Sequence, residues 1–517
     1  MLETVFMAER INPLSPCIIG TARRTWNHGQ VAPEPLDMWD EVSRAAAIDA
    51  VLGTRTTARD VLKAVDEIGL VHCQSWYYDD PPLRLAQRLG QPAARREESI
   101  LAGTSPQRLC DAAAARMLAG ETSVAIVVGG EALATQKEFD RNGTERGWSF
   151  PHPHPPAFPV HLNEWYLPTE IAHGVLPAWL TFALLEQARW AERGADAADR
   201  YRLGEVMDRL NSVASQNPDA WFPQRHSAST IITPTKDNRM IATPYTKLMT
   251  AFLDVDMAAA NLLVTHEVAE RWGVPPERRV YLRGWGFARD TVHIAERTEL
   301  GSSPAMRSAS SEALKRAGLN IGQIDVFDLY SCFPAAMQFA TDALGIDESD
   351  QRDLSLTGGL PYHGGPGSNY MSHSISHMVD RLRTGSVGTA MVTGVGMHMT
   401  KHVAGVWSTT PGTIANKTDH GPQRWTQENA VPRHPEEPPP RLIVEQASGS
   451  AVLAAATAVY ETASSDPYVV AICKLSETER CYARSSQSEV LEAVISGNWA
   501  GASGHVEFNG ITNELSL

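Results

Sequence analysis

The chain lacks the features that mark several common protein classes. It has no apolar run of about 18 residues, the length that a membrane-spanning helix requires. Its 517 residues include only six cysteines, and none of them is in C-x-x-C spacing. Scattered cysteines of this kind indicate neither a disulfide framework nor a metal site, and they favour a reduced compartment. The sequence therefore predicts a cytoplasmic protein with no membrane span and no bound metal.

Positive charge is also scarce. The chain has 45 Lys and Arg residues against 60 Asp and Glu residues, which gives a formal net charge of −15. Because nucleic acids and anionic membranes are bound mainly through positive charge that meets phosphate, this balance argues against both partners. An anionic ligand would have to be held by local groups.

Hydrophobic residues are plentiful, at 43% of the chain, and the length is consistent with two or three structural units. The stretch Ser99–Glu131 predicts a strand, a tight turn at Gly103–Pro106, an Ala-rich helix through Cys110–Leu118 and a strand at Val124–Val128. A helix that is apolar on nearly every side lies inside a protein. We expect Gly120 to end this helix in a left-handed conformation.

The same alternation recurs later in the chain. Strands are predicted at Val280–Gly284, Ile324–Tyr330 and Thr389–Gly396, with a helix at Ser303–Ala317. Strands separated by helices favour a parallel sheet covered by helices. Two successive blocks of this kind indicate an internal duplication.

An insertion separates the two blocks. Between Ala134 and Gln224 the composition changes to Trp, His and Pro, and the run at 150–156 alternates proline with histidine. A helix is predicted inside the insertion at Pro177–Arg193. Beyond the insertion, Val255–Val264 fits a strand that leads into a helix, and it also fits a buried Ala-rich helix.

The last part of the chain differs from the rest. A Pro-rich linker leads to short β-type runs, among them Glu479–Ser485 and Glu489–Ile495, which predict a small barrel or sandwich whose shape resembles an oligonucleotide-binding fold. A linker of this composition predicts that few contacts cross it, so that the extension folds separately.

Motif order and spacing identify the chain as similar to the thiolase superfamily, especially its sterol-carrier-type and thiolase-like branches. The resemblance rests on the turn, Ala-rich helix and G-G-x-E strand of Ser99–Glu131, on Y-S-C-F at Tyr330–Phe333, and on the glycine-rich loop at Thr357–Ser368. It implies an α/β, duplicated thiolase fold with two βαβαβαββ halves layered α-β-α-β-α. A loop domain and a small β-rich C-terminal domain would complete the chain.

The resemblance also implies domain boundaries. The N-terminal half would cover 10–270 and include the loop domain at about 134–240, and the C-terminal half would cover 271–412. A linker at 413–440 would lead to a β-rich domain at 441–517.

Two positions that carry thiolase chemistry are occupied by glycine. Counting seventeen residues back from Gly120 places Gly103 where the family has its acyl-accepting cysteine. The G-G-x-x-x-x-G-H-P loop of the family aligns so that Gly365 stands at the histidine position. Ser105 lies near the lost nucleophile, and it fits a hydroxyl that caps the helix better than a substitute nucleophile.

Cys332 is the one residue of the catalytic set that the resemblance retains. It occupies the cysteine of the sterol-carrier-type H-D-C-F motif, and Tyr330 replaces the first residue of that motif. A cysteine there would be an acid or base if a neighbour lowered its pKa, and otherwise a packed thiol. Tyr330 would donate a hydrogen bond to a carbonyl.

The glycine-rich loop is the candidate ligand-binding element. Gly364 and Gly365, with Ser105, would cradle an anion by exposed N–H groups and a helix N-terminus. His363 is either a loop histidine or a residue that leans toward the site. His398 and His402, four residues apart, would lie on one helix face near it.

Two functions follow from the resemblance. The first is a CoA- or acyl-CoA-binding protein with little or no thiolysis, without a resident cofactor, as a monomer or homodimer with a role around lipid and acyl-CoA metabolism. The second is an active acyl-CoA C-acyltransferase of the acetyl-CoA acetyltransferase type that uses Cys332 or another residue.

Overall fold

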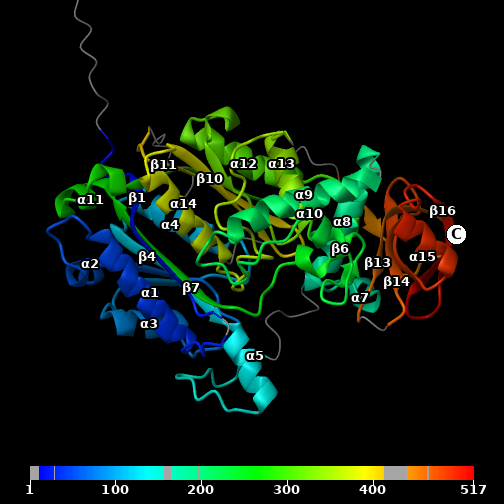
Figure 1. Cartoon of the computed structure of the whole chain (residues 1–517), viewed down its shortest axis with the longest axis horizontal. Coiled ribbons are helices and arrows are strands. Elements are labelled where there is room, and N and C mark those ends of the chain that lie inside the picture. The colour runs from blue at the N-terminus through cyan, green and yellow to red at the C-terminus, as the bar shows by residue number, and fades with distance from the viewer. Residues whose placement is uncertain are drawn as a thin grey trace, which may run out of the picture.

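Two similar α/β halves form the body of the protein, and a β barrel forms one end (Figure 1). The structure is a computed structural model, and it describes residues 11–27, 29–156, 165–194, 197–347, 349–412, 439–462 and 465–517. In Figure 1 the N-terminal half is blue and cyan except for its last two elements, at 256–272, which are green; the C-terminal half is green and yellow, and the barrel is orange and red.

The N-terminal half contains five strands in the order β3-β2-β4-β7-β1. The strands β2, β3 and β4 run parallel, and β7 is antiparallel to β4 and β1. The elements are β1 (Pro16–Thr25), α1 (Pro35–Ala50), α2 (Ala58–Ala64), β2 (Glu67–Leu70), α3 (Pro81–Leu89), β3 (Arg95–Glu98), α4 (Ser105–Leu118), β4 (Val124–Ala132), β7 (Asp256–Thr265) and α11 (His266–Trp272).

The C-terminal half repeats this plan with four strands in the order β8-β11-β10-β9. The place of the missing strand is taken by 353–354, whose carbonyls accept hydrogen bonds from Phe327 N and Leu329 N beside β9. The elements are η2 (Pro276–Arg278), β8 (Val280–Arg289), η3 (Ile294–Glu296), α12 (Pro304–Ala317), η4 (Ile321–Gln323), β9 (Val326–Asp328), α13 (Pro334–Leu344), α14 (Tyr370–Arg383), β10 (Thr389–Gly396) and β11 (Lys401–Ser408).

The duplication is visible in how one helix meets one strand in each half. A Cβ atom at Gly20 of β1 would lie 2.2 Å from the carbonyl oxygen of Ala46 in α1. A Cβ atom at Gly284 of β8 would likewise lie 2.2 Å from the carbonyl oxygen of Ala313 in α12. Glycine on the strand and alanine on the helix thus allow the same close approach twice, which confirms the predicted internal repeat.

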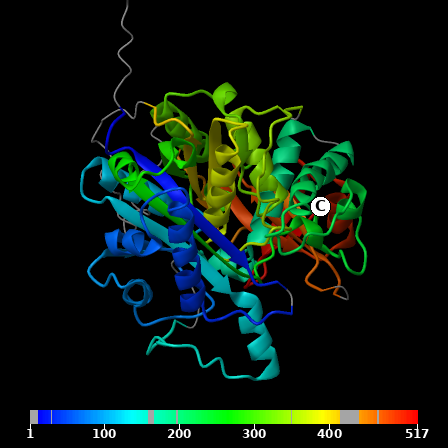
Figure 2. The ribbon, with the colours of Figure 1, turned by 60° about the vertical axis from the view of Figure 1, so that its left-hand side comes forward.

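The layers follow from which helices are buried on all sides. The helices α4 and α14 contact strands of both halves and lie in the middle, whereas α1 covers the outer face of the N-terminal half and α12 that of the C-terminal half. Figure 2 shows the yellow helix α14 between the two sets of strands. The predicted thiolase-type α-β-α-β-α layering is confirmed. The halves meet edge to edge as well, since β1 pairs with β8 at Cys17 and Ile18.

The strand prediction for Val255–Val264 is confirmed, and the alternative of a buried Ala-rich helix is wrong. The segment forms β7, all ten residues of which are buried between β4 and β1. Alanine is a weak strand former, but this strand is covered on both faces, and small side chains leave room for α1 and α14. A Cβ atom added at Gly130 of β4 would lie 2.5 Å from Ala258 Cβ, so the packing is close.

The loop domain is inserted between β4 and β7. Its elements are α5 (Leu133–Asn142), α7 (Pro168–Ala172), α8 (Ala178–Arg193), α9 (Ala197–Ala214), α10 (Ala228–Ile232), β5 (Met240–Ala242), β6 (Tyr245–Thr246) and η1 (Lys247–Met249). The helix predicted at Pro177–Arg193 is α8.

The C-terminal extension is a closed five-stranded barrel. Its elements are β12 (Leu442–Ile443), β13 (Gly449–Val459), β14 (Tyr468–Lys474), β15 (Glu479–Ser485), α15 (Ser488–Ser496), β16 (Ser503–Phe508) and β17 (Asn513–Ser516). The pairs β13–β14, β14–β15, β15–β17, β17–β16 and β16–β13 close the ring, and β15–β17 is the parallel pair. This connectivity, with a helix between the third and fourth strands, is that of an oligonucleotide-binding fold. The strand predicted at Glu489–Ile495 is wrong, because it lies in α15.

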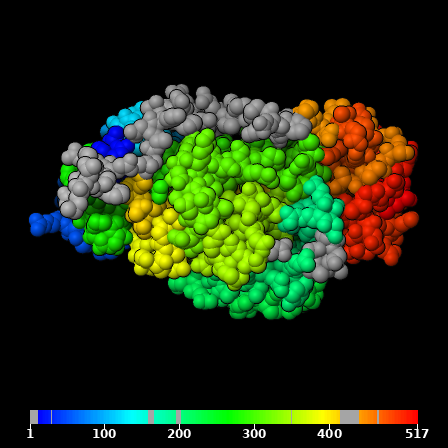
Figure 3. All heavy atoms as spheres, turned by 90° about the horizontal axis from the view of Figure 1, so that it is seen from above, coloured from blue at the N-terminus to red at the C-terminus, as the bar shows by residue number. Residues whose placement is uncertain are grey.

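The barrel does not stand apart from the rest of the chain, contrary to the expectation from the Pro-rich linker, whose residues 413–438 lie outside the described part. Strand β13 extends to β5 of the loop domain by the pair Val459 and Ala242. The outer faces of β14 and β15 place Val470, Ile472 and Tyr482 in the same apolar cluster as the body of the protein. Figure 3 shows the orange and red barrel joined to the body without a visible gap.

Candidate functional site

Three segments that are far apart in the sequence meet at Gly103. This residue lies in the turn before α4, and a Cβ atom added to it would lie 2.3 Å from Tyr330 Oη. The carbonyl oxygen of Val395, near the end of β10, would lie at the same distance of 2.3 Å. The backbone of Gly103 has no positive φ, so its conformation does not require glycine. Glycine is required because a tyrosine hydroxyl occupies the space that a side chain would fill.

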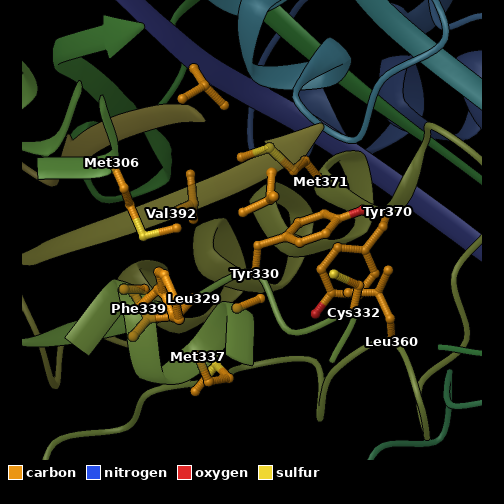
Figure 4. Packing of buried hydrophobic residues seen from close by; sticks show 14 of the residues in the cluster. Met306, Leu329, Tyr330, Cys332, Met337, Phe339, Leu360, Tyr370, Met371 and Val392 are labelled. Carbon is orange, nitrogen blue, oxygen red and sulfur yellow. The ribbon is translucent and has the colours of Figure 1, made fainter. Parts of the chain in front are cut away.

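Tyr330 follows the end of β9, and two contacts fix it, one from its backbone and one from its ring to an aromatic residue of α14. Its backbone N–H donates to Thr393 Oγ1 at 3.0 Å, and its ring meets Tyr370 edge-on at 5.5 Å between centroids. Figure 4 shows the Tyr330 ring between Met371 and Cys332, with Tyr370 beside it. Burial raises the pKa of Tyr330 well above its usual value, so the phenol is protonated and is able to donate a hydrogen bond.

Cys332 lies beside this tyrosine in the apolar core. The residue is 8% exposed, and its backbone carbonyl accepts a hydrogen bond from Ala251 N at 2.9 Å. Burial raises the pKa of the Cys332 thiol, which keeps it protonated near neutrality. Since the thiolate is the reactive form, this environment favours a packed thiol over an activated one.

The glycine-rich loop is held by hydrogen bonds within the protein. Gly365 N donates to the carbonyl oxygen of Phe252 at 2.9 Å, and Gly364 has a φ of 101°, which favours glycine. A Cβ atom at Gly365 would lie 3.1 Å from Leu360 Cδ2, so a side chain there has room if Leu360 shifts slightly. The anion cradle predicted from Gly364 and Gly365 therefore cannot use the Gly365 N–H, and their role in ligand binding stays a prediction.

His363 turns away from the Gly103 turn and toward α14. Its ring is fully buried, with centroids 5.3 Å from His373 and 5.7 Å from His377, and its Nδ1 lies 3.2 Å from the carbonyl oxygen of Gly364. Burial lowers the pKa of His363 to about 4, so the ring is neutral. Within the described ranges, no three His, Cys, Asp or Glu side chains are arranged to hold a metal ion.

Ser105 begins α4 and points inward. Its hydroxyl donates to the carbonyl oxygen of Ile100 at 2.8 Å, and the residue is fully buried. The helix N-cap is Thr104, not Ser105. The hydroxyl thus closes the turn locally, and a ligand contact by Ser105 stays a prediction.

Asp328 is a residue of the site that the sequence analysis missed. Its carboxylate, fully buried at the end of β9, accepts hydrogen bonds from Thr357 N at 3.0 Å, Leu356 N at 2.7 Å and Ser374 Oγ at 2.6 Å. It thereby ties the start of the glycine-rich loop and α14 to the strand that carries Tyr330. A charged residue inside the apolar strand Ile324–Tyr330 was the available signal.

His398 and His402 do not share a helix face. The first lies in the turn between β10 and β11, and the second lies in β11. Nε2 of the His402 ring donates to Asp290 Oδ2 at 2.9 Å. The helical spacing was misleading because the segment is a β turn.

The chemistry that these side chains allow follows from their types. The space beside Gly103 holds the neutral phenol of Tyr330, and Gly365 has no titratable side chain. A protonated phenol can hold a carbonyl oxygen but cannot form a thioester.

Among solved structures, the chain is similar to a monomeric SCP2-thiolase-like protein type 1 from Mycobacterium smegmatis, with 28% identity and a TM-score of 0.81 over 98% of this chain and 100% of that one. Human mitochondrial 3-ketoacyl-CoA thiolase matches with 14% identity and a TM-score of 0.55 over 77% of this chain and 100% of that one. An Ltp2-ChsH2(DUF35) aldolase matches with 17% identity and a TM-score of 0.58 over 77% of this chain and 98% of that one. The last two likenesses concern the fold alone.

Among curated proteins, acetyl-CoA acetyltransferase of Methanothermobacter thermautotrophicus is 25% identical over 231 residues. That match covers 40% of this chain and 58% of the relative, so the chain matches less than two thirds of the relative's length. No protein-family model matches the chain. The duplicated halves and the loops that meet at Gly103 define the class, and the chain belongs to the thiolase superfamily. Within it, the chain is an SCP2-thiolase-like protein.

Proposed function

We propose that this thiolase-superfamily protein binds CoA or acyl-CoA reversibly and has little or no thiolase activity. The observation that carries the proposal is the Tyr330 hydroxyl, which lies 2.3 Å from the position that a side chain at Gly103 would occupy. Thiolysis through a covalent intermediate requires a nucleophile at that position. The tyrosine fills the space and supplies a hydrogen-bond donor instead.

The absence of a base at Gly365 supports the same proposal. Gly365 carries no base, and His363 is buried against α14 with its pKa lowered to about 4. A nucleophile without its base and oxyanion donors would lose most of its rate, because these groups act as a unit. We propose that Tyr330 donates to the thioester carbonyl of a bound acyl-CoA.

The alternative is an acyl-CoA C-acyltransferase that uses Cys332. Burial raises the pKa of this thiol, and a protonated thiol is a poor nucleophile. We therefore favour the binding protein, with a role around acyl-CoA metabolism. By analogy with the neighbour described as monomeric, we also propose a monomer.

Calorimetry with CoA and acetyl-CoA, together with an acetoacetyl-CoA cleavage assay, tests the proposal. We expect reversible binding of both ligands, no cleavage above background, and no acyl adduct on Cys332 or Ser105 by mass spectrometry. Tyr330→Phe should weaken acetyl-CoA binding by about threefold to tenfold, as expected for one lost hydrogen bond, and should leave CoA binding unchanged.

Tyr370→Phe is the matched control, since it removes a hydroxyl from the neighbouring ring. That hydroxyl bonds to Thr357 Oγ1 within the protein, so the ratio of the two affinities should stay as in the wild type. Cleavage at a rate typical of thiolases, or an adduct on Cys332, would favour the acyltransferase.

A further inference from the structure

The turn between β10 and β11 has two residues in a conformation that side chains rarely adopt. Met397 and Met399 have φ values of 53° and 54°, and neither is glycine, asparagine or aspartate. Such residues persist only where the surrounding structure holds them, and they gather at functional sites. The turn lies directly after the strand end that borders Gly103.

The end of β10 helps to define the space around Gly103. The carbonyl oxygen of Val395 is one of the two atoms nearest to the side-chain position of Gly103, at 2.3 Å. Cβ atoms added to its neighbours would lie 3.2 Å from Gly103 O at Gly394 and 3.2 Å from Ala102 Cβ at Gly396. A shift of the turn would therefore change the shape of the site.

One arginine binds the backbone of the turn between β10 and β11. Nη2 of Arg297 donates to the carbonyl oxygens of His398 and Met399, each at 2.8 Å. The ring of His398 is held on both sides, with Nε2 2.8 Å from Tyr166 Oη and Nδ1 2.9 Å from Thr181 Oγ1. Arg297 is 3% exposed, so its hydrogen bonds are shielded from water.

A second arginine, from the barrel, holds the segment that carries the first. Arg480 of β15 donates from Nη1 to the carbonyl oxygens of Arg297 at 2.5 Å and Ala295 at 3.2 Å, and from Nη2 to that of Thr298 at 3.2 Å. Tyr482, two residues further on the same strand, donates to Glu170 Oε1 at 2.8 Å and accepts from Ala295 N at 3.3 Å. The barrel thus fixes the backbone at 295–298.

We propose that Arg480 and Arg297 are positioning residues that form a chain from the C-terminal barrel to the site. Barrel docking fixes the backbone at 295–298, Arg297 in turn holds the Met397–Thr400 turn, and the turn sets Val395 against Gly103. The barrel is then a structural part of the ligand site, although the atoms nearest to the side-chain position of Gly103 belong to Tyr330 and Val395 and not to the barrel. This inference concerns geometry, and it does not depend on which ligand the site takes.

Hydrogen exchange of the full-length protein, followed by mass spectrometry, tests each link without a ligand. Arg297→Met keeps the carbonyl that Arg480 binds but loses both bonds to the turn. We expect peptides covering 395–402 to exchange about tenfold faster, as two lost hydrogen bonds imply, and peptides covering 293–298 to stay at the wild-type rate. Arg480→Met should accelerate both sets, and Arg480→Lys, which still donates to carbonyls, should accelerate them less.

Arg484→Met is the matched control on the same strand. Its guanidinium stacks over the Tyr468 ring at 4.1 Å, and its loss should change neither set of peptides. If Arg480→Met accelerates 293–298 but leaves 395–402 at the wild-type rate, the barrel does not hold the turn and the proposal is wrong. If Arg480→Met loosens the whole barrel, the proposal is decided by Arg480→Lys and Arg297→Met, in which the exchange rates of 293–298 and 395–402 are compared in the same way. Since no ligand is added, failure here is distinct from failure of the proposed CoA binding.

Discussion

At the scale of single residues, the site depends on Gly103 and Tyr330 together, because the tyrosine fills the space that a side chain at Gly103 would occupy. Gly103, which the resemblance aligns with the family's cysteine, has no side chain, and Tyr330, the first residue of the Y-S-C-F motif, has a ring that reaches the same place. Each change alone was visible in the sequence as a departure from the thiolase pattern. Their complementarity was not, because it depends on a distance between two loops that no sequence pattern encodes.

This exchange predicts that Gly103 tolerates no side chain. Gly103→Ala should lower the free energy of unfolding by about 1–3 kcal/mol, the usual cost of overpacking, because the carbonyl of Val395 is backbone and cannot turn aside. Gly365→Ala, the matched control, should cost less than about 1 kcal/mol, since its nearest neighbour is the flexible end of Leu360. Urea denaturation measures both.

A double-mutant cycle identifies the cause. Tyr330→Phe removes one of the two atoms at 2.3 Å but leaves the carbonyl oxygen of Val395 at 2.3 Å and Cζ at 2.7 Å, so it should recover part of the loss in Gly103→Ala and none in Gly365→Ala. Equal losses at the two glycines would contradict the claim that the space at Gly103 is filled. Because of the same contacts, we expect that replacing Gly103 with Cys and Gly365 with His does not rebuild a thiolase site while Tyr330 remains.

At the scale of elements, the secondary structure was predicted correctly where the residues fit either a helix or a strand. It was predicted wrongly where they fit both. The helix α4 is buried at most of its positions and the strand β4 at all of them, and both were located correctly. Glu489–Ile495 was assigned to a strand because of its valines, yet Val490 and Val494, spaced four apart, face the barrel from a helix. Spacing of four residues was the better guide than valine content.

The three histidines on α14 and the glycine-rich loop predict a stability that falls with acid. Burial lowers the pKa of His363 to about 4 and that of His373 well below its usual value, so the unfolded chain takes up protons first. Between pH 6.5 and pH 4, protonation therefore favours unfolding, by about 3 kcal/mol for His363 alone. Above that range this contribution does not change with pH.

His373→Phe isolates the effect. Neither ring nitrogen of His373 has a hydrogen-bond partner among the described residues, so phenylalanine removes a titrating group and no hydrogen bond seen there. We expect a smaller loss of unfolding free energy between pH 7 and pH 5 than in the wild type, measured by urea denaturation. His505→Gln, at an exposed position in β16, should keep the wild-type loss, and equal losses in all three proteins would refute the assignment.

At the scale of the whole molecule, the barrel uses the surface by which its fold usually binds ligands. In this fold the faces of the second and third strands bind oligonucleotides. Here those strands are β14 and β15, and their outward residues Val470, Ile472 and Tyr482 are fully buried against the body. The body therefore covers the face that would bind an oligonucleotide, and the net charge of −15 opposes the approach of phosphate. The sequence predicted the barrel's shape but not its docking, because alternation along a strand does not show what covers its outer face.

This docking predicts that the rest of the chain does not fold well without the barrel. A chain that ends at Pro435 would expose the apolar cluster beneath β14 and β15 and would lose the pairing of β5 with β13. Arg480 and Tyr482 would no longer bind the backbone at 295 and 297 or the carboxylate of Glu170. Exposed apolar surface of this kind favours aggregation.

Light scattering, dye binding and calorimetry of the shortened chain measure the outcome. We expect it to aggregate or to bind a hydrophobic dye, and to lose the cooperative melting transition of the full chain. Tyr482→Phe in the full chain is the milder comparison: it removes one hydroxyl from the same interface, and it should lower the transition temperature while keeping a single transition. A shortened chain that stays soluble and melts like the full protein would mean that the interface contributes little to the stability of the body, and that the linker divides two independent units after all.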